Sequence, residues 1–146
     1  PNTAISVRKS LTCICSNDTG SQFLDLCVSI FNSVGKAIII DESKMQSATV
    51  MCASGIAFWM RIIRAMAQGG VELGFEAKDS LEISYRTAEG AINLLEKNKT
   101  HPEQEIDKVT TPSGCTIKGI IEMENKGLSS AIIHGLISSH EKINNI

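Results

Sequence analysis

The spacing of apolar and polar positions changes near residue 42, and this change predicts two kinds of structure. Residues 4–16 and 36–41 are short extended or apolar runs of the kind that forms strands, and residues 21–34 carry apolar side chains at helical spacing. After residue 42 the spacing is helical almost throughout. The pattern therefore predicts strand, helix and strand, followed by a mainly helical region.

Residues that favour turns divide the helical region into separate segments. We predict helices at 44–53, 54–73, 78–97, 112–126 and 129–142, with a short acidic turn at 103–107. The segment at 54–73 is apolar nearly all round, which is typical of a central or interface helix. Its core, residues 56–67, is too short to span a bilayer and contains two arginines, so we expect no membrane segment.

The residues around Thr111 are the strongest candidate for a binding site. Thr111 suits an N-cap, and Pro112 suits the first helical position, where its missing N–H costs nothing. Ser113, Gly114 and Cys115 are small, so a ligand can approach the free N–H groups and the positive end of the helix dipole. We expect an anion here. From local chemistry alone, a capped helix start without a ligand is the commoner explanation, because such starts are frequent.

Composition and charge narrow the range of partners. The 146 residues suit one ordinary domain, and 42% hydrophobic with 21% charged residues is typical of a soluble globular protein. The net charge of -2, with acids and bases interspersed, argues against nucleic acid. Small molecules or protein partners are therefore expected.

The five cysteines show neither a disulfide framework nor a CxxC metal knuckle. Cys13 and Cys15 would share one face of a strand, but no histidine or acid at ligand spacing accompanies them. We therefore expect buried, reduced thiols, no metal site and a reducing compartment, the cytoplasm.

Around the central stretch the chain resembles the pyrroline-5-carboxylate reductase family. The family signature is an aspartate, a valine after one residue, a hydroxyl residue, proline, two glycines, a variable residue and threonine, and residues 107–116 follow this order. Residues 1–3 resemble the family's asparagine-threonine element, and residues 52–57 resemble its serine-glycine-serine-glycine-proline-alanine element. The resemblance covers essentially the whole chain.

The chain departs from the family pattern at several positions. Ser113 replaces the first glycine of the signature, Ala53 and Ile56 differ from the second element, and Gln46 stands where an aspartate is expected. The signature threonine, Thr116, is retained. The departures therefore bear on substrate preference and rate more than on the family.

The resemblance implies a fold and a division of the chain. In the family, an N-terminal Rossmann domain binds NADPH or NADH through a glycine fingerprint, which this sequence lacks. The chain also begins with proline, so we expect a piece of a longer protein that is inactive alone. Residues 1–42 then belong to the end of the cofactor region, and residues 43–146 form a mainly α-helical, bundle-like domain for dimerisation and substrate binding.

The resemblance also implies a reaction, which is hydride transfer to the C=N bond of 1-pyrroline-5-carboxylate to give L-proline. By resemblance, Thr116 is the catalytic residue that orients the imine nitrogen. Asn2 and Thr3 are the candidates for contact with the cofactor. The expected substrate-binding residues are Thr111, Ser113, Gly114, Cys115 and Thr116.

Two other readings stay open at the level of sequence. One is a non-enzymatic helical domain in which the helix at 54–73 forms the core of a dimer. The other is a reductase of a different cyclic imine. Binding of a small carboxylate at residues 111–116 would favour an enzyme over the non-enzymatic domain. The choice between NADPH and NADH, and assembly beyond a homodimer, are left open.

Overall fold

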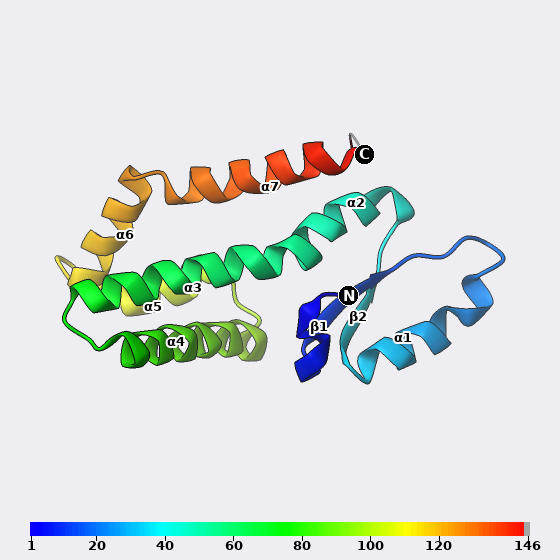
Figure 1. The fold of residues 1–146 in the computed structure, drawn as a ribbon, viewed down its shortest axis with the longest axis horizontal. Coiled ribbons are helices and arrows are strands. Elements are labelled where there is room, and N and C mark those ends of the chain that lie inside the picture. Colours follow the sequence, from blue (N-terminus) through cyan, green and yellow to red (C-terminus); the bar gives the residue numbers. More distant parts are fainter. Residues whose placement is uncertain (145–146) are drawn as a thin grey trace. The chain divides into compact units, whose positions relative to one another are not determined.

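The computed structural model describes residues 1–144, and the chain divides into two compact units. One contains Pro1–Trp59 and the end of the last helix from Ile133 onward, and the other contains Met60–Ile132. Among the described residues, strands occur only in the first unit (Figure 1). The prediction of a mainly helical chain with one or two short N-terminal strands is confirmed.

The first unit contains a small strand-helix-strand arrangement. Strand β1 (Ser10–Ile14) leads to helix α1 (Leu24–Asn32) and then to strand β2 (Gly35–Ile39), which is parallel to β1. The register pairs Ser10 with Gly35, which has φ +156°. A Cβ at Gly35 would collide with the backbone of Ser10. Only glycine therefore fits where the second strand begins.

Residues 42–72 form one continuous helical stretch. Its parts are a 3-10 turn (Glu42–Lys44), α2 (Met45–Ala48), a π-helical segment (Thr49–Ser54) and α3 (Gly55–Glu72). The predicted break between helices at residues 53 and 54 is wrong, because the chain widens into π turns in which the Gly55 N–H donates to the Val50 carbonyl. Such turns are rare within helices and often mark functional sites.

By length and composition, the stretch Glu42–Glu72 is able to cross a membrane, since an 18-residue window reaches a mean hydropathy of 1.4. The sequence argument that residues 56–67 are too short to span a bilayer is wrong on length, because these residues belong to a helix of 31 residues. Only 11% of the apolar window is buried within the chain. The helix therefore carries apolar surface that the chain itself does not cover.

The second unit is built from helices joined by short turns. The helices after α3 are α4 (Ala77–Asn98), α5 (Pro102–Val109), α6 (Cys115–Asn125) and α7 (Leu128–Asn144), of which α7 continues into the first unit. Ser80 connects α4 to α3 through a hydrogen bond, in which its hydroxyl donates to the carbonyl of Ala67 at 2.7 Å. Ser80 is 2% exposed, and a Cβ on Gly70 would collide with its hydroxyl. The two helices thus meet through small residues.

Helix α5 replaces the predicted acidic turn at 103–107, so that prediction is wrong. The His101 ring accepts the N–H of Glu103 at 3.3 Å, and the Gln104 side chain accepts the N–H of His101 at 3.0 Å. Pro102 occupies the first turn, where proline is favoured. The start signals are present in the sequence, but the 8 residues of α5 are too few to show clear periodicity.

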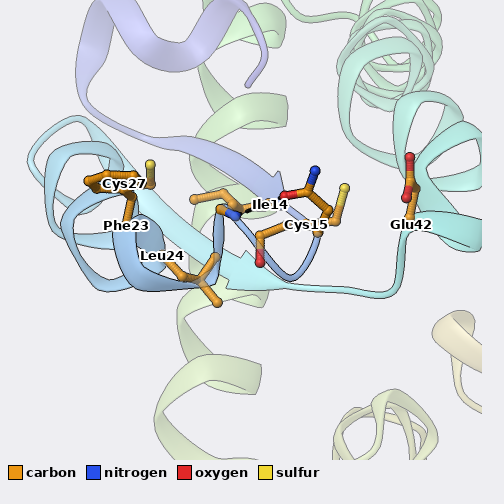
Figure 2. A pocket seen from close by; sticks show the side chains of 9 residues that line it. Ile14, Cys15, Phe23, Leu24, Cys27 and Glu42 are labelled. Carbon is orange, nitrogen blue, oxygen red and sulfur yellow. Dashed lines mark hydrogen bonds between the residues drawn. The ribbon is translucent and has the colours of Figure 1, made fainter.

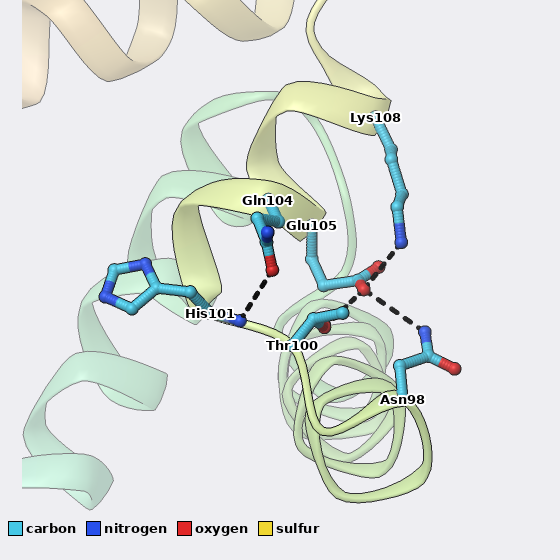
Figure 3. A network of polar contacts seen from close by, with 6 residues as sticks. All are labelled: Asn98, Thr100, His101, Gln104, Glu105 and Lys108. Carbon is cyan, nitrogen blue, oxygen red and sulfur yellow. Dashed lines mark hydrogen bonds and ion pairs between the residues drawn. The ribbon is translucent and has the colours of Figure 1, made fainter.

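Glu105 is the centre of a polar network that joins α5 to the end of α4 (Figure 3). Its carboxylate accepts hydrogen bonds from the Asn98 amide at 3.2 Å and the Thr100 hydroxyl at 2.5 Å, and it pairs with the Lys108 ammonium at 2.7 Å. The bond from Lys108, followed by those from Thr100 and Asn98, lowers the pKa of Glu105 to about 2. The connection that leads into α5 is therefore held by a carboxylate that stays charged at neutral pH.

The start of α6 differs from its prediction. The N-cap is Gly114 and the helix begins at Cys115, so the assignments of Thr111 as N-cap and Pro112 as first helical residue are wrong. The physical reason is Ser113, which has φ +59°. A right-handed helix does not continue through a residue in this left-handed conformation.

The single chain has almost no apolar core. Val50, at 2% exposure, is the only buried large hydrophobic residue among those described. Trp59, Met60 and Met66 of α3 are instead 59%, 61% and 56% exposed. A chain of this length ordinarily buries most of its apolar side chains. Stable folding therefore requires that something else cover this surface.

We predict that the Glu105 network makes the α4–α5 connection sensitive to acid. The folded-state pKa of about 2 lies below the ordinary value of 4.5, so the network stabilises the fold above about pH 4.5 and its contribution is lost as the pH falls toward 2. Glu105→Gln should lower hydrogen-exchange protection of residues 98–105 at neutral pH and remove the acid dependence. Glu103→Gln, on the same helix, is the control and should retain it. Protection unchanged in Glu105→Gln would contradict this role.

Candidate functional site

The predicted substrate-binding residues lie in the tight turn between α5 and α6 and at the first two positions of α6. The N–H of Gly114 donates to the carbonyl of Thr111 at 2.9 Å and closes the turn. A Cβ on Gly114 would collide with the hydroxyl oxygen of Thr111 and lie 3.0 Å from its carbonyl oxygen. Any larger residue would open the turn. The turn therefore places the Thr111 hydroxyl against the start of α6.

The first turn of α6 presents backbone N–H groups without a side-chain cap, because its N-cap is glycine. The N–H groups of Cys115, Thr116 and Ile117 have no carbonyl partner earlier in the helix, and they lie at the positive end of its dipole. The N–H of Gly114 already donates to Thr111. The donors open to a ligand are thus those of the first three helical residues.

The side chains of this site differ in exposure. Thr111, Ser113 and Cys115 are exposed, whereas Thr116 is half-buried. Thr116 and Ile120 lie one helical turn apart on the same face, and Ile120 is also half-buried. Of the two side chains that open α6, that of Thr116 is therefore the sheltered one.

The departures from the family pattern have distinct structural settings. Ser113, in place of a glycine, adopts a left-handed conformation with φ +59°, which costs a residue with a Cβ roughly 1 to 2 kcal/mol. Ala53 lies inside the π-helical segment, and Ile56 is the second residue of α3. The π turns therefore form without the family's proline. Gln46 is exposed on α2.

Asn2 and Thr3 lie in the first unit, whereas the turn lies in the second. The Asn2 side-chain oxygen accepts the N–H of Ala4 at 3.1 Å, and its amide nitrogen donates to the carbonyl of Cys52 at 3.0 Å. The backbone N–H of Asn2 donates to the Ser10 hydroxyl at 3.0 Å. Asn2 thus links the chain start to β1 and to the π-helical segment. One hydrogen of its side-chain amide is left for a ligand. Thr3 is exposed.

Two hollows in the chain lie apart from the predicted turn. One, of about 490 Å³, lies where β1 ends, and Figure 2 shows side chains from the end of β1, the start of α1 and Glu42 around it. The other, of about 630 Å³, has a mainly apolar lining from α4 and α5. Neither is lined by residues 111–116. Thr111, Ser113 and Cys115 are exposed, so the turn lies at the surface of the single chain.

Residues 1–144 contain no cluster of three or more histidine, cysteine or acidic side chains that could hold a metal ion. The chemistry available at the site consists of hydroxyl groups, backbone N–H groups and the exposed thiol of Cys115. Such groups bind and orient a small anion, and they do not by themselves transfer hydride. Sequence reasoning missed Glu105, which fixes the helix before the turn and whose only sequence signal is its spacing of three residues from Lys108.

Comparison with known proteins gives a consistent result. The profile of the family described as "Pyrroline-5-carboxylate reductase dimerisation" matches residues 42–146. Pyrroline-5-carboxylate reductase 2 of Dictyostelium discoideum is 47% identical, over 97% of this chain and 52% of that protein. Pyrroline-5-carboxylate reductase 1 of the same organism is 46% identical, over 97% of this chain and 28% of that protein.

The fold agrees with the sequence comparison. The crystal structure of Plasmodium falciparum pyrroline carboxylate reductase with NADP bound superposes with a TM-score of 0.91 at 26% identity, over 97% of this chain and 59% of that one. The chain thus spans between about a quarter and three fifths of the length of these relatives. Since the family profile covers the whole helical region from residue 42 onward, the chain belongs to the pyrroline-5-carboxylate reductase family.

Proposed function

We propose that the protein takes part in the reduction of 1-pyrroline-5-carboxylate to L-proline by NADPH or NADH, the last step of proline biosynthesis. The observation that carries this proposal is the turn at residues 111–114, which opens α6 with uncapped N–H groups beside two hydroxyl side chains. The chain spans only part of its relatives, so the activity is proposed for the full-length protein. The family membership favours this substrate over a different cyclic imine.

The substrate carboxylate suits the start of α6. The N–H groups of Cys115 and Thr116 point along the helix toward its open end and bind an anion without any charged side chain. The Thr111 hydroxyl lies beside them, because the turn packs it against Gly114. Hydrogen bonds to a carboxylate are stronger than those between neutral groups. Ser113, exposed in the middle of the turn, adds a further hydroxyl at this edge.

The imine nitrogen is assigned to Thr116. Reduction of the C=N bond adds hydride to carbon and a proton to nitrogen, so a hydroxyl near the nitrogen orients the ring and holds the proton or the water that supplies it. Thr116 is half-buried at the second position of α6, next to the N–H groups assigned to the carboxylate. One helix end therefore positions both polar ends of the substrate.

The described residues do not fit the pyrophosphate of a dinucleotide. Such a cradle needs a GxGxxG turn between strand and helix, and the loop from β1 to α1 contains a single glycine, Gly20. A Cβ on Gly20 would already lie 3.1 Å from the Asn17 side chain, so no free space is reserved there. NAD(P)H supplies the hydride when bound to the full-length enzyme. Asn2 and Thr3 are the proposed contacts of this chain with it.

We further propose that the protein is a homodimer whose second copy covers α3. The exposed side chains of α3 include Trp59, Met60 and Met66, and the 18-residue apolar window within Glu42–Glu72 is 11% buried. The matching family profile is named for dimerisation. Arg61 and Arg64 interrupt the apolar surface, which suits a protein interface with a polar rim better than a bilayer.

The remaining proposals concern location and other partners. All five cysteines are free thiols, which supports the cytoplasm as the compartment. The net charge of -2 supports the absence of a nucleic-acid partner.

Introducing a charged side chain on α3 tests whether this helix lies in a dimer interface. We expect the protein to sediment as a dimer at micromolar concentration and Met66→Glu to weaken the dimer by at least about tenfold, because an unpaired carboxylate would be buried. Gln68→Glu is the matched control on the same helix and should change little, because residue 68 is already polar. Analytical ultracentrifugation of the three proteins measures this. A stable monomer of the unchanged protein would contradict the proposal.

The site is tested by Thr116 in the full-length enzyme. Thr116→Ala removes a hydrogen bond to a partly charged group, a loss of roughly 1.5 to 3 kcal/mol. We therefore expect kcat/KM to fall roughly ten- to a hundredfold or somewhat more, while Thr116→Ser, which keeps the hydroxyl, loses much less.

Steady-state kinetics of both variants should be measured with circular dichroism and sedimentation as controls for folding. Because α6 begins before Thr116, both variants should fold and dimerise normally. Full activity of Thr116→Ala would remove this residue from the site.

A further inference from the structure

Two cysteines that are far apart in sequence meet in the first unit. The sulfur of Cys13, on β1, lies 3.4 Å from the sulfur of Cys52, in the π-helical segment, across 39 positions of sequence. Both side chains are half-buried. Within residues 1–144, no other two cysteine sulfurs form such a contact. The fold therefore selects one pair from five thiols.

We propose that Cys13 and Cys52 are a reversible redox pair, which a small-molecule disulfide such as oxidised glutathione converts into a disulfide that links β1 to the π-helical segment. A disulfide bond is about 2.05 Å long, so the sulfurs need to approach by about 1.4 Å from their contact of 3.4 Å. Side-chain rotation and a small shift of the π turns supply a movement of this size. The proposal does not depend on the reductase reaction.

An oxidant can reach this pair. Cys13 and Cys52 both line a hollow of about 210 Å³ that also borders Met45, Thr49 and Ala53. The hollow opens to solvent and also borders Pro1. The neighbouring Asn2 amide donates a hydrogen bond to the Cys52 carbonyl. The thiols therefore differ from a sealed core pair, which a small-molecule disulfide would not reach in the folded protein.

The order of the two steps follows from the protonation of Cys52. Burial, followed by the hydrogen bond with Cys13, raises the pKa of Cys52 to about 11. The raised pKa of Cys52 lowers the fraction of its thiolate, which is the form that attacks a disulfide. The first attack is assigned to Cys13, and Cys52 resolves the mixed disulfide, since it then lies beside an activated sulfur.

The exchange balances in atoms and electrons. The Cys13 thiolate attacks one sulfur of oxidised glutathione, whose S–S bond breaks and releases one glutathione thiolate. Cys52 then loses its proton and attacks the Cys13 sulfur, which expels the second glutathione. Two protein thiols are oxidised, one small-molecule disulfide is reduced to two thiols, and these take up the two protons. Excess reduced glutathione reverses both steps.

Oxidation should stiffen a segment that is already anchored. Asn2 joins the chain start to the carbonyl of Cys52 at 3.0 Å, and the same residue bonds to Ser10 at the start of β1. A disulfide adds a covalent link between the same two elements. We therefore expect slower hydrogen exchange across Thr49–Ser54 in the oxidised protein, with the Asn2 contacts retained.

The test is equilibration of the purified protein, in its native assembly, with mixtures of reduced and oxidised glutathione. The five thiols of each chain should fall to three, because two are consumed, and peptide mapping without reductant should find Cys13 joined to Cys52. The equilibrium constant for this disulfide should be at least about tenfold larger in the folded protein than in urea, where only chain length sets the effective concentration. Reduction should restore five thiols.

Variants provide the matched controls. Cys13→Ser should keep all four remaining thiols, because the attacking group is gone. Cys52→Ser should stop at the mixed disulfide of Cys13 with glutathione and keep three thiols, whereas Cys15→Ser, which changes a neighbouring half-buried thiol, should still form the pair. The peptide map of the unchanged protein tests the proposed disulfide even if a variant folds poorly. Five persistent thiols, separate glutathione adducts on Cys13 and Cys52, or an equilibrium constant no larger than in urea would each overturn the proposal.

Discussion

The helical stretch Glu42–Glu72 carries an apolar surface that the chain leaves open, and the stability of the remaining structure depends on covering it. Full burial of one large apolar side chain contributes roughly 1.5 to 3 kcal/mol, and Trp59, Met60 and Met66 are each more than half exposed on α3 alone. The contacts inside the chain are of a different kind. Ser80 and Gly70 let α3 and α4 approach closely, but they bury little apolar area. A second copy of the chain supplies the missing cover in our account.

The form of the candidate site, by contrast, is set by contacts inside the chain. The turn at residues 111–114 is closed by a hydrogen bond from Gly114 to Thr111, and the close contact of these two residues leaves no room for a Cβ at position 114. Helix α5, which leads into it, is held by the Glu105 network. Yet the turn is exposed, and the described hollows lie elsewhere. In our proposal the chain provides orientation and anion binding, while exclusion of water comes from other parts of the assembled enzyme.

Spacing along the chain predicts elements that are long or regular, and it fails where a few residues decide the conformation. The strands, α1 and α4 follow from periodicity. The continuity of α2 with α3 does not, because Gly55 suggests a break while the backbone forms π turns instead. The start of α6 was misplaced because Pro112 fits a helix as well as a turn, and the positive φ of Ser113 is not visible in a serine.

The residues of the candidate site could be named from the sequence only as a contiguous motif and by family resemblance, and their role stays a prediction. Their local geometry, with Gly114 rather than Thr111 at the helix cap, required the structure. The pairing of Cys13 with Cys52 was beyond sequence reasoning for a different reason. A contact across 39 positions depends on how a strand and a π-helical segment meet, and no spacing rule within either element encodes it.

The most direct test of the central claim, that the start of α6 binds the substrate carboxylate, is an NMR titration of the isotope-labelled protein in its native assembly. L-proline, the product, carries the carboxylate, and L-prolinamide is the matched ligand without it. The account predicts that L-proline shifts the amide signals of Cys115 and Thr116 strongly, while L-prolinamide at equal concentration has little effect. Equal shifts with both ligands, or shifts confined to other parts of the chain, would contradict it.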